Sequence, residues 1–104
     1  MLLLRLERHN RASWPDDLPA AVAEFEALVD LLASSEPVHV LVEAERSARA
    51  RVEFHVVPSD DAWLRDTGPS FVREGPALVA LDWGFNGWGA KYPHAHDAGI
   101  AARV

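Results

Sequence analysis

The sequence predicts an α/β fold in which neighbouring strands run parallel. An amphipathic segment at 18–34 is typical of a surface helix, and short runs rich in Val and Leu lie on both sides of it, at 2–6, 37–43 and 52–57. Because strands and helices alternate along the chain, a parallel sheet with helical connections is favoured. The 104 residues amount to one domain.

The helix at 18–34 is the clearest of these elements. Its apolar residues recur at helical spacing and form one stripe, made of Val22, Phe25, Leu28, Val29 and Leu32. Asp16 or Asp17 is expected to accept hydrogen bonds from the first turn, and the residues from Ser34 to Pro37 are expected to end the helix. No residue of this segment suggests chemistry, so we interpret it as a helix that covers the sheet.

The strands on either side carry two histidines. In 37–43 the valines at 38, 40 and 42 alternate with His39 and Leu41, which predicts that the two sets face opposite sides of the sheet. A short solvated helix is expected at 44–50, and Pro58 ends the strand at 52–57. We expect His39 and His55 to be partly buried and hydrogen-bonded to the backbone.

The second half of the chain predicts a β-hairpin followed by a glycine-rich loop. Strands at 70–73 and 77–83 flank a turn that contains Gly75. The loop at 84–89 holds three glycines, which permit positive φ or close backbone approach, together with Phe85 and Trp88. Residues 100–104 are expected to begin a helix.

Composition excludes several classes of function. The formal charge is −6 with no basic block, which disfavours nucleic acid and anionic membrane as partners and suits a cationic ligand. No apolar run reaches the length of a membrane span, and we find no signal peptide, so the cytoplasm is the expected location. There is no cysteine, which excludes disulfides and thiolate metal sites within the sequence.

The segment 60–70 concentrates charge around one indole. Four charged residues surround Trp63 just before a turn at Gly68-Pro69. An aromatic face beside fixed carboxylates suits a planar cation, because the ring covers one face while carboxylate oxygens accept the in-plane N–H groups. Guanidinium is the planar cation that fits best.

Two blocks in this half resemble the agmatine deiminase and bacterial peptidyl-arginine deiminase family. The blocks are W-L-R-D-T-G-P at 63–69 and L-D-W-G-F-N-G-W-G-A-K-Y at 81–92. The resemblance implies a five-bladed β/α propeller of the pentein type, of which residues 1–104 would form the N-terminal part, with one or two ββαβ-like blades. It also implies hydrolysis of a guanidine to a ureido product and ammonia. Agmatine is the preferred substrate over peptidyl-arginine, and putrescine biosynthesis is the implied pathway.

The resemblance also assigns site residues. Asp66 matches the family's first guanidinium-binding aspartate and is the implied catalytic residue, while Trp63 matches the aromatic lining of the substrate slot. Trp88 borders the slot or packs under the glycine loop. The alternatives for Asp66 are an ion pair with Arg65 or a cap of the turn at Thr67, and the alternative for Trp63 is packing in the core.

The family's base His, second carboxylate and Cys nucleophile lie far downstream, so whether this chain is itself an enzyme stays open. It is an N-terminal piece of a deiminase, inactive alone, or a gene remnant, or a non-catalytic module that binds guanidinium compounds or a partner protein. The expected partners are a small guanidine and a separately encoded C-terminal half or a second copy. No cofactor or metal is implied; His94, His96 and Asp97 are potential ligands, but their pattern is a weak metal signal.

Overall fold

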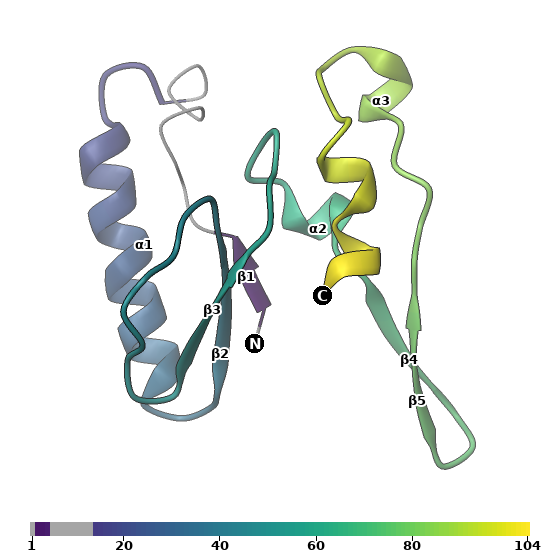
Figure 1. Cartoon of the computed structure of the whole chain (residues 1–104), viewed down its shortest axis with the longest axis horizontal. Helices are drawn as coiled ribbons and strands as arrows, with labels where there is room; N and C mark the ends of the chain where they lie inside the picture. Colours follow the sequence, from purple (N-terminus) through teal and green to yellow (C-terminus); the bar gives the residue numbers. More distant parts are fainter. Residues whose placement is uncertain (1, 5–13) are drawn as a thin grey trace. The chain divides into compact units, whose positions relative to one another are not determined.

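The computed structural model describes residues 2–4 and 14–104, which form two compact units at 1–57 and 58–104 (Figure 1). Each unit is a small mixed α/β assembly with short strands, and each is described separately below. In the part of the chain that the structure describes, no helix is both long and apolar enough to cross a membrane.

The first unit contains a three-stranded parallel sheet in the order β1-β2-β3. The strands are β1 (Leu2–Leu4), β2 (Val38–Val42) and β3 (Val52–Val56). In register, Leu2 lies opposite His39 and Val38 lies opposite Val52. The predicted parallel arrangement is therefore confirmed, although residues 5 and 6 of the first predicted strand lie outside the described residues.

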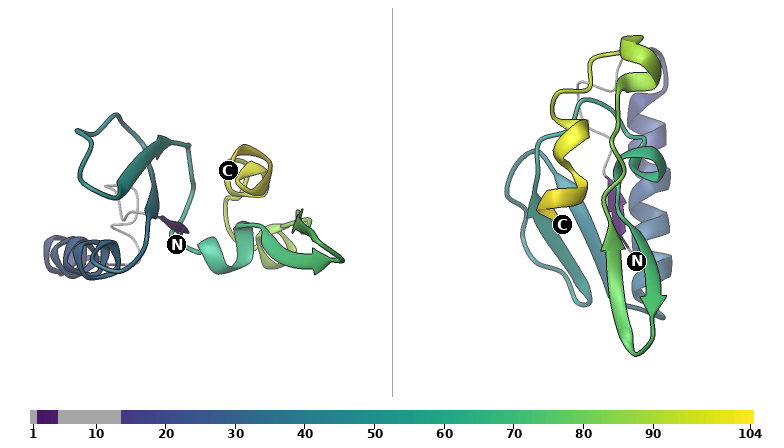
Figure 2. Two further views of the ribbon diagram at one scale, coloured as in Figure 1. Left: turned by 90° about the horizontal axis from the view of Figure 1, so that it is seen from below. Right: turned by 90° about the vertical axis from the view of Figure 1, so that its right-hand side faces the viewer.

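Helix α1 (Leu18–Ala33) packs on one face of this sheet, as the left view of Figure 2 shows. The alternation in β2 places its valines toward the helix, where they form the core together with Val29 and Val52. The cluster consists of Val29, Val38, Val40, Val42 and Val52, with Phe25, Leu32, Ala33 and Phe54 packed against it. Burial of these apolar side chains holds α1 to the sheet.

The two ends of α1 differ in how their backbone groups are satisfied. Asp17 occupies the N-cap position, but its side chain makes no capping hydrogen bond, so the expected aspartate cap is wrong. At the other end the hydroxyls of Ser34 and Ser35 donate to the carbonyls of Leu31 and Leu32, at 2.6 and 3.1 Å. The predicted end of the helix near Ser34 is confirmed.

The connection at 43–51 is irregular, so the predicted short helix at 44–50 is wrong. The segment must travel back along a five-residue strand, about 16 Å, whereas seven helical residues span only about 10 Å. Arg49 instead anchors it to α1, with its guanidinium 2.9 Å from Glu26 and 3.0 Å from Asp30. Arg51, at a φ of 60°, donates to the carbonyl of Ser35 at 2.8 Å.

The second unit begins with a single helical turn, α2 (Leu64–Thr67), followed by the hairpin of β4 (Ser70–Glu74) and β5 (Ala77–Leu81). The strands are antiparallel, with Ser70 opposite Leu81, which confirms the predicted hairpin. Gly75 has a φ of 58° in the connecting turn.

Short turns complete the second unit. They are α3 (Gly87–Ala90) and the 3-10 turns η2 (Asp97–Gly99) and η3 (Ala101–Arg103). Within α3, Trp88 and Gly89 have φ values of 54° and 83°, so the segment remains the glycine-dependent loop that the sequence predicts. The helix expected at 100–104 is only a 3-10 turn.

Candidate functional site

The charged loop after Pro58 is held by a reciprocal pair of aspartates, which we call the aspartate clasp. The backbone N–H groups of Asp60 and Asp61 donate to the carboxylate of Asp97, at 2.7 and 3.4 Å. In return, the N–H groups of His96 and Asp97 donate to the carboxylate of Asp60, at 2.7 and 3.3 Å. The clasp thereby ties the start of the signature segment to η2.

Asp97 is the buried member of the clasp, with 2% of its surface exposed. Burial raises the pKa of its carboxyl group above the ordinary value, because the charged form loses contact with water, while the hydrogen bonds from Asp60 and Asp61 act in the opposite direction. Asp97 therefore has a structural role and is not free to bind a ligand.

The turn α2 presents the central residues of the signature outward. Thr67 is buried and its hydroxyl donates to the carbonyl of Trp63 at 3.2 Å, while the N–H of Gly68 donates to the carbonyl of Leu64 at 2.8 Å. A Cβ atom on Gly68 would lie 2.8 Å from that same Leu64 oxygen, so the tight turn requires glycine there. With these contacts directed inward, Arg65 and Asp66 are exposed.

Asp66 presents a carboxylate that none of the described residues binds. It makes neither the ion pair with Arg65 nor the side-chain cap at Thr67 that the sequence left open; only its backbone N–H is engaged, by the carbonyl of Trp63 at 2.9 Å. A carboxylate with solvated oxygens on a fixed turn can accept hydrogen bonds from a cationic ligand. The exposure of Asp66 is compatible with the substrate role that the resemblance implies.

The structure brings Trp63 and Trp88 together, although 25 positions separate them in the sequence. Their rings meet edge to face with centroids 6.2 Å apart, and both are about half exposed. Trp88 also meets Phe85 at 5.1 Å and Tyr92 at 5.8 Å, again edge to face. Each indole therefore combines packing with an open face, so neither is a fully buried core residue.

The glycine loop sets the position of Trp88. Gly87 has a φ of 61°, and a Cβ there would come within 2.5 Å of the His94 ring and 2.7 Å of the Tyr92 carbonyl. The side chain of Asn86 accepts a hydrogen bond from the N–H of Gly89 at 3.0 Å. Glycine and this cap allow the backbone turn on which Trp88 meets Trp63.

Sequence reasoning missed the clasp and the other members of the aromatic cluster. Phe85 and Tyr92 lie in the second block, so their proximity to Trp88 had a local signal. The pairing of Asp60 with Asp97 had none, because it joins residues 37 positions apart. Two of the three potential metal ligands at 94–97 make other contacts, since His94 Nδ1 lies 2.9 Å from the Tyr92 carbonyl and Asp97 belongs to the clasp.

Comparison with known proteins identifies the family of this chain. A family model described as Porphyromonas-type peptidyl-arginine deiminase matches residues 2–104. The chain is 42% identical over 87 residues to an agmatine deiminase of Stutzerimonas stutzeri, covering 76% of this chain and 24% of that relative. It is 38% identical over 105 aligned residues to an agmatine deiminase of Pseudomonas aeruginosa, covering 88% of this chain and 28% of that relative.

The chain thus spans about a quarter of the length of these curated relatives. The matched region includes both blocks that carry the two tryptophans and Asp66. On the strength of the family model, which covers nearly every residue, this chain belongs to the Porphyromonas-type peptidyl-arginine deiminase family.

Proposed function

We propose that this chain is the N-terminal part of an agmatine deiminase-like hydrolase and that its second unit supplies one wall of a guanidinium slot. The observation that carries the proposal is the exposed Asp66 carboxylate, unpartnered among the described residues, on the turn that begins beside Trp63. The relatives named above are agmatine deiminases, which supports a small guanidine as the ligand.

The reaction requires that this side of the slot both orient the guanidinium group and cover its plane. The guanidinium carbon is a poor electrophile because resonance spreads its charge, so the group must be held in one orientation for attack. Asp66 would accept two in-plane N–H groups as a bidentate pair, and an indole face would cover the plane or the alkyl stem. Trp63 and Trp88 present such faces at the edge of their cluster.

The remaining chemical groups would come from other segments. Conversion to a ureido product and ammonia needs a nucleophile and a proton-transferring His, and this sequence contains no cysteine. We propose that residues 1–104 form one or two blades of a five-bladed propeller and that the chain alone is inactive. Completion of the slot would require a C-terminal portion that carries the nucleophile.

The hairpin supports this need for further contacts. Phe71 is 59% exposed and Leu78 is 66% exposed on one face of the hairpin, while Val72 is exposed on the other. A two-stranded ribbon with apolar side chains on both faces gains stability when another element covers it. We propose that a C-terminal half of the enzyme, or a second copy, covers these side chains.

A second candidate is a non-catalytic module that binds guanidinium compounds or a protein. The intact Asp66 turn favours this candidate over random decay of the sequence. A non-functional remnant would retain the sequence resemblance without binding.

Titration of the chain with agmatine, followed by NMR or calorimetry, separates these candidates. We expect saturable binding that Asp66→Asn weakens at least tenfold, whereas Asp16→Asn, which makes the same charge change at an exposed site in the first unit, leaves it unaltered. Ammonia release after mixing with a Cys-containing C-terminal portion identifies the split enzyme. Agmatine binding without ammonia release supports the non-catalytic module. If agmatine binds neither to the chain alone nor to its mixture with the C-terminal portion, the proposal is contradicted.

A further inference from the structure

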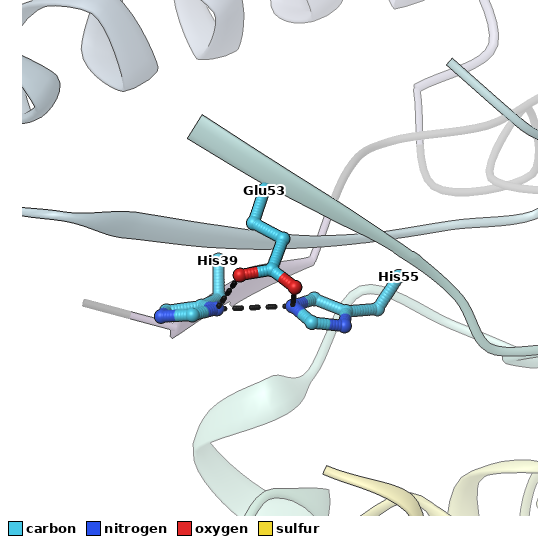
Figure 3. Close-up of side chains that lie close together, drawn as sticks. All are labelled: His39, Glu53 and His55. Carbon is cyan, nitrogen blue, oxygen red and sulfur yellow. Dashed lines mark hydrogen bonds and ion pairs between the residues drawn. The ribbon is translucent and has the colours of Figure 1, made fainter. Parts of the chain in front are cut away.

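Three potential metal ligands converge on the face of the parallel sheet opposite α1. His39 projects from β2, and Glu53 and His55 project from β3 (Figure 3). The parallel register places His39 opposite Glu53, and His55 follows two residues later on the same face of β3. The sheet itself therefore assembles this group, which we call the histidine-glutamate trio.

The spacing of the donor atoms suits a single small cation. His39 Nδ1 lies 3.0 Å from His55 Nε2. Glu53 Oε2 lies 3.6 Å from His39 Nδ1, and Glu53 Oε1 lies 3.9 Å from His55 Nε2. An ion with tetrahedral ligands at zinc distances keeps those ligands about 3.3–3.6 Å apart. Small rotations of the side chains would bring all three donors to that spacing.

Hydrogen bonding within the trio does not engage all of the atoms that could ligate a metal. The contact between the two rings needs one proton on one of the facing nitrogens, and the other nitrogen then accepts it. The Glu53 carboxylate lies beyond hydrogen-bond distance of both nitrogens, so neither ring donates to it. One cation placed between the three groups would bind all three at once.

We propose that the histidine-glutamate trio binds a zinc-class divalent transition-metal ion. Two imidazoles and one carboxylate form a donor set that zinc accepts, with the fourth position left to water. The side chains of His39, Glu53 and His55 are 44%, 67% and 36% exposed, so the ion would reach them from solvent. Bound there, it would cross-link β2 and β3 and stabilise the first unit.

This inference differs from what the sequence predicts. The sequence places potential ligands at His94, His96 and Asp97 and treats His39 and His55 as hydrogen-bonded to the backbone. The structure instead pairs His39 with His55, and the strand register adds Glu53. The proposal is independent of the guanidinium slot, which lies in the other unit.

Calorimetric titration of the chain with Zn²⁺ tests the proposal. We expect one ion per chain, with affinity reduced at least tenfold by His39→Ala or His55→Ala and several-fold by Glu53→Gln. His96→Ala is the matched control, because it removes an exposed imidazole of the second unit, and it is expected to leave the affinity unchanged. The visible absorption of bound Co²⁺ should disappear with the same two histidine substitutions.

Thermal unfolding of the unaltered chain gives a measurement that does not depend on the variants. The midpoint should rise with Zn²⁺ and not with Mg²⁺, because binding to the native state stabilises it and Mg²⁺ prefers oxygen ligands. The proposal is overturned if Zn²⁺ neither binds nor shifts the midpoint. Affinity that survives both histidine substitutions, or that His96→Ala abolishes, also overturns it.

Discussion

The two units of this chain differ in how completely they bury their apolar residues. In the first unit, α1 and the sheet enclose a cluster of valines with Phe25 and Leu32 at its border. In the second, hairpin residues such as Phe71 and Leu78 remain exposed, and the contacts that fix the loops are hydrogen bonds and aromatic edges. The first unit contains its own core, whereas the second depends more on polar contacts.

The proposed guanidinium-binding residues lie in the unit that buries less apolar surface. The signature residues Trp63, Asp66 and Trp88 all lie in the unit with less apolar burial, on turns rather than in strands. Loops held by a scaffold carry binding residues in many proteins, since their side chains are free to meet a ligand. The first unit, by contrast, offers packing and the histidine-glutamate trio.

The largest expected effect comes from a substitution in the valine core. Val40 is fully buried at the centre of β2, so Val40→Ala should lower the free energy of unfolding by about 2–3 kcal/mol through lost burial and a new cavity. The half-exposed Val56 in β3 is the control, and Val56→Ala should change stability by less than about 0.5 kcal/mol. Urea unfolding followed by circular dichroism measures both, and equal effects would contradict a self-contained core in the first unit.

A smaller effect is expected in the aspartate clasp. Asp97→Ala removes the acceptor for two backbone N–H groups and should destabilise the second unit by about 2 kcal/mol. Tryptophan fluorescence and amide exchange at Asp60 report the change. Asp82→Ala, which truncates an exposed aspartate of the same unit, is the control. Unchanged exchange at Asp60 would show that the clasp does not hold the loop.

The pH dependence of the clasp gives a finer test. Because burial raises the pKa of Asp97, the native state keeps a proton that the unfolded chain has already released. The stabilisation from this proton is fully present below the unfolded pKa and is lost as pH rises through the folded pKa. The unaltered chain should therefore lose stability relative to Asp97→Asn as pH increases from about 3 through the folded pKa. A flat difference, or one of opposite slope, would contradict the burial argument.

The smallest effect on stability is expected at the hairpin. Leu78→Ser should change the free energy of unfolding by less than about 0.5 kcal/mol, because the side chain is already exposed. It should nevertheless reduce self-association in sedimentation velocity experiments if a second copy covers this face. Ala77→Ser, a milder change next to it, is the control. A large loss of stability would show that the hairpin has internal packing that its exposure hides.

Local patterns were enough to predict most of the fold. Periodicity gave α1 within one residue of its end, and alternation in β2 correctly separated the valines from His39 and Leu41. The helix expected at 44–50 failed because the span between parallel strands, together with the anchoring of Arg49 to α1, outweighs local propensity. Such a constraint is visible only once the strand directions are known.

The site was predictable to a different degree. The two blocks pointed to Trp63 and Trp88, and the structure places their rings in contact. The role of Asp66 remains a prediction, since its exposure permits binding without demonstrating it. The clasp and the histidine-glutamate trio were beyond sequence reasoning, because each depends on residues that only the folded backbone brings together.

The aspartate clasp has a practical consequence for protein engineering. It joins the two ends of the second unit, so the turn at Gly75 can be opened while those ends remain connected. No atom of the described residues lies within 4 Å of a Cβ atom built at Gly75, but its φ of 58° favours glycine, so a peptide tag would be inserted next to Gly75 with the glycine kept. An engineered label at this tip would report when another polypeptide docks along the hairpin.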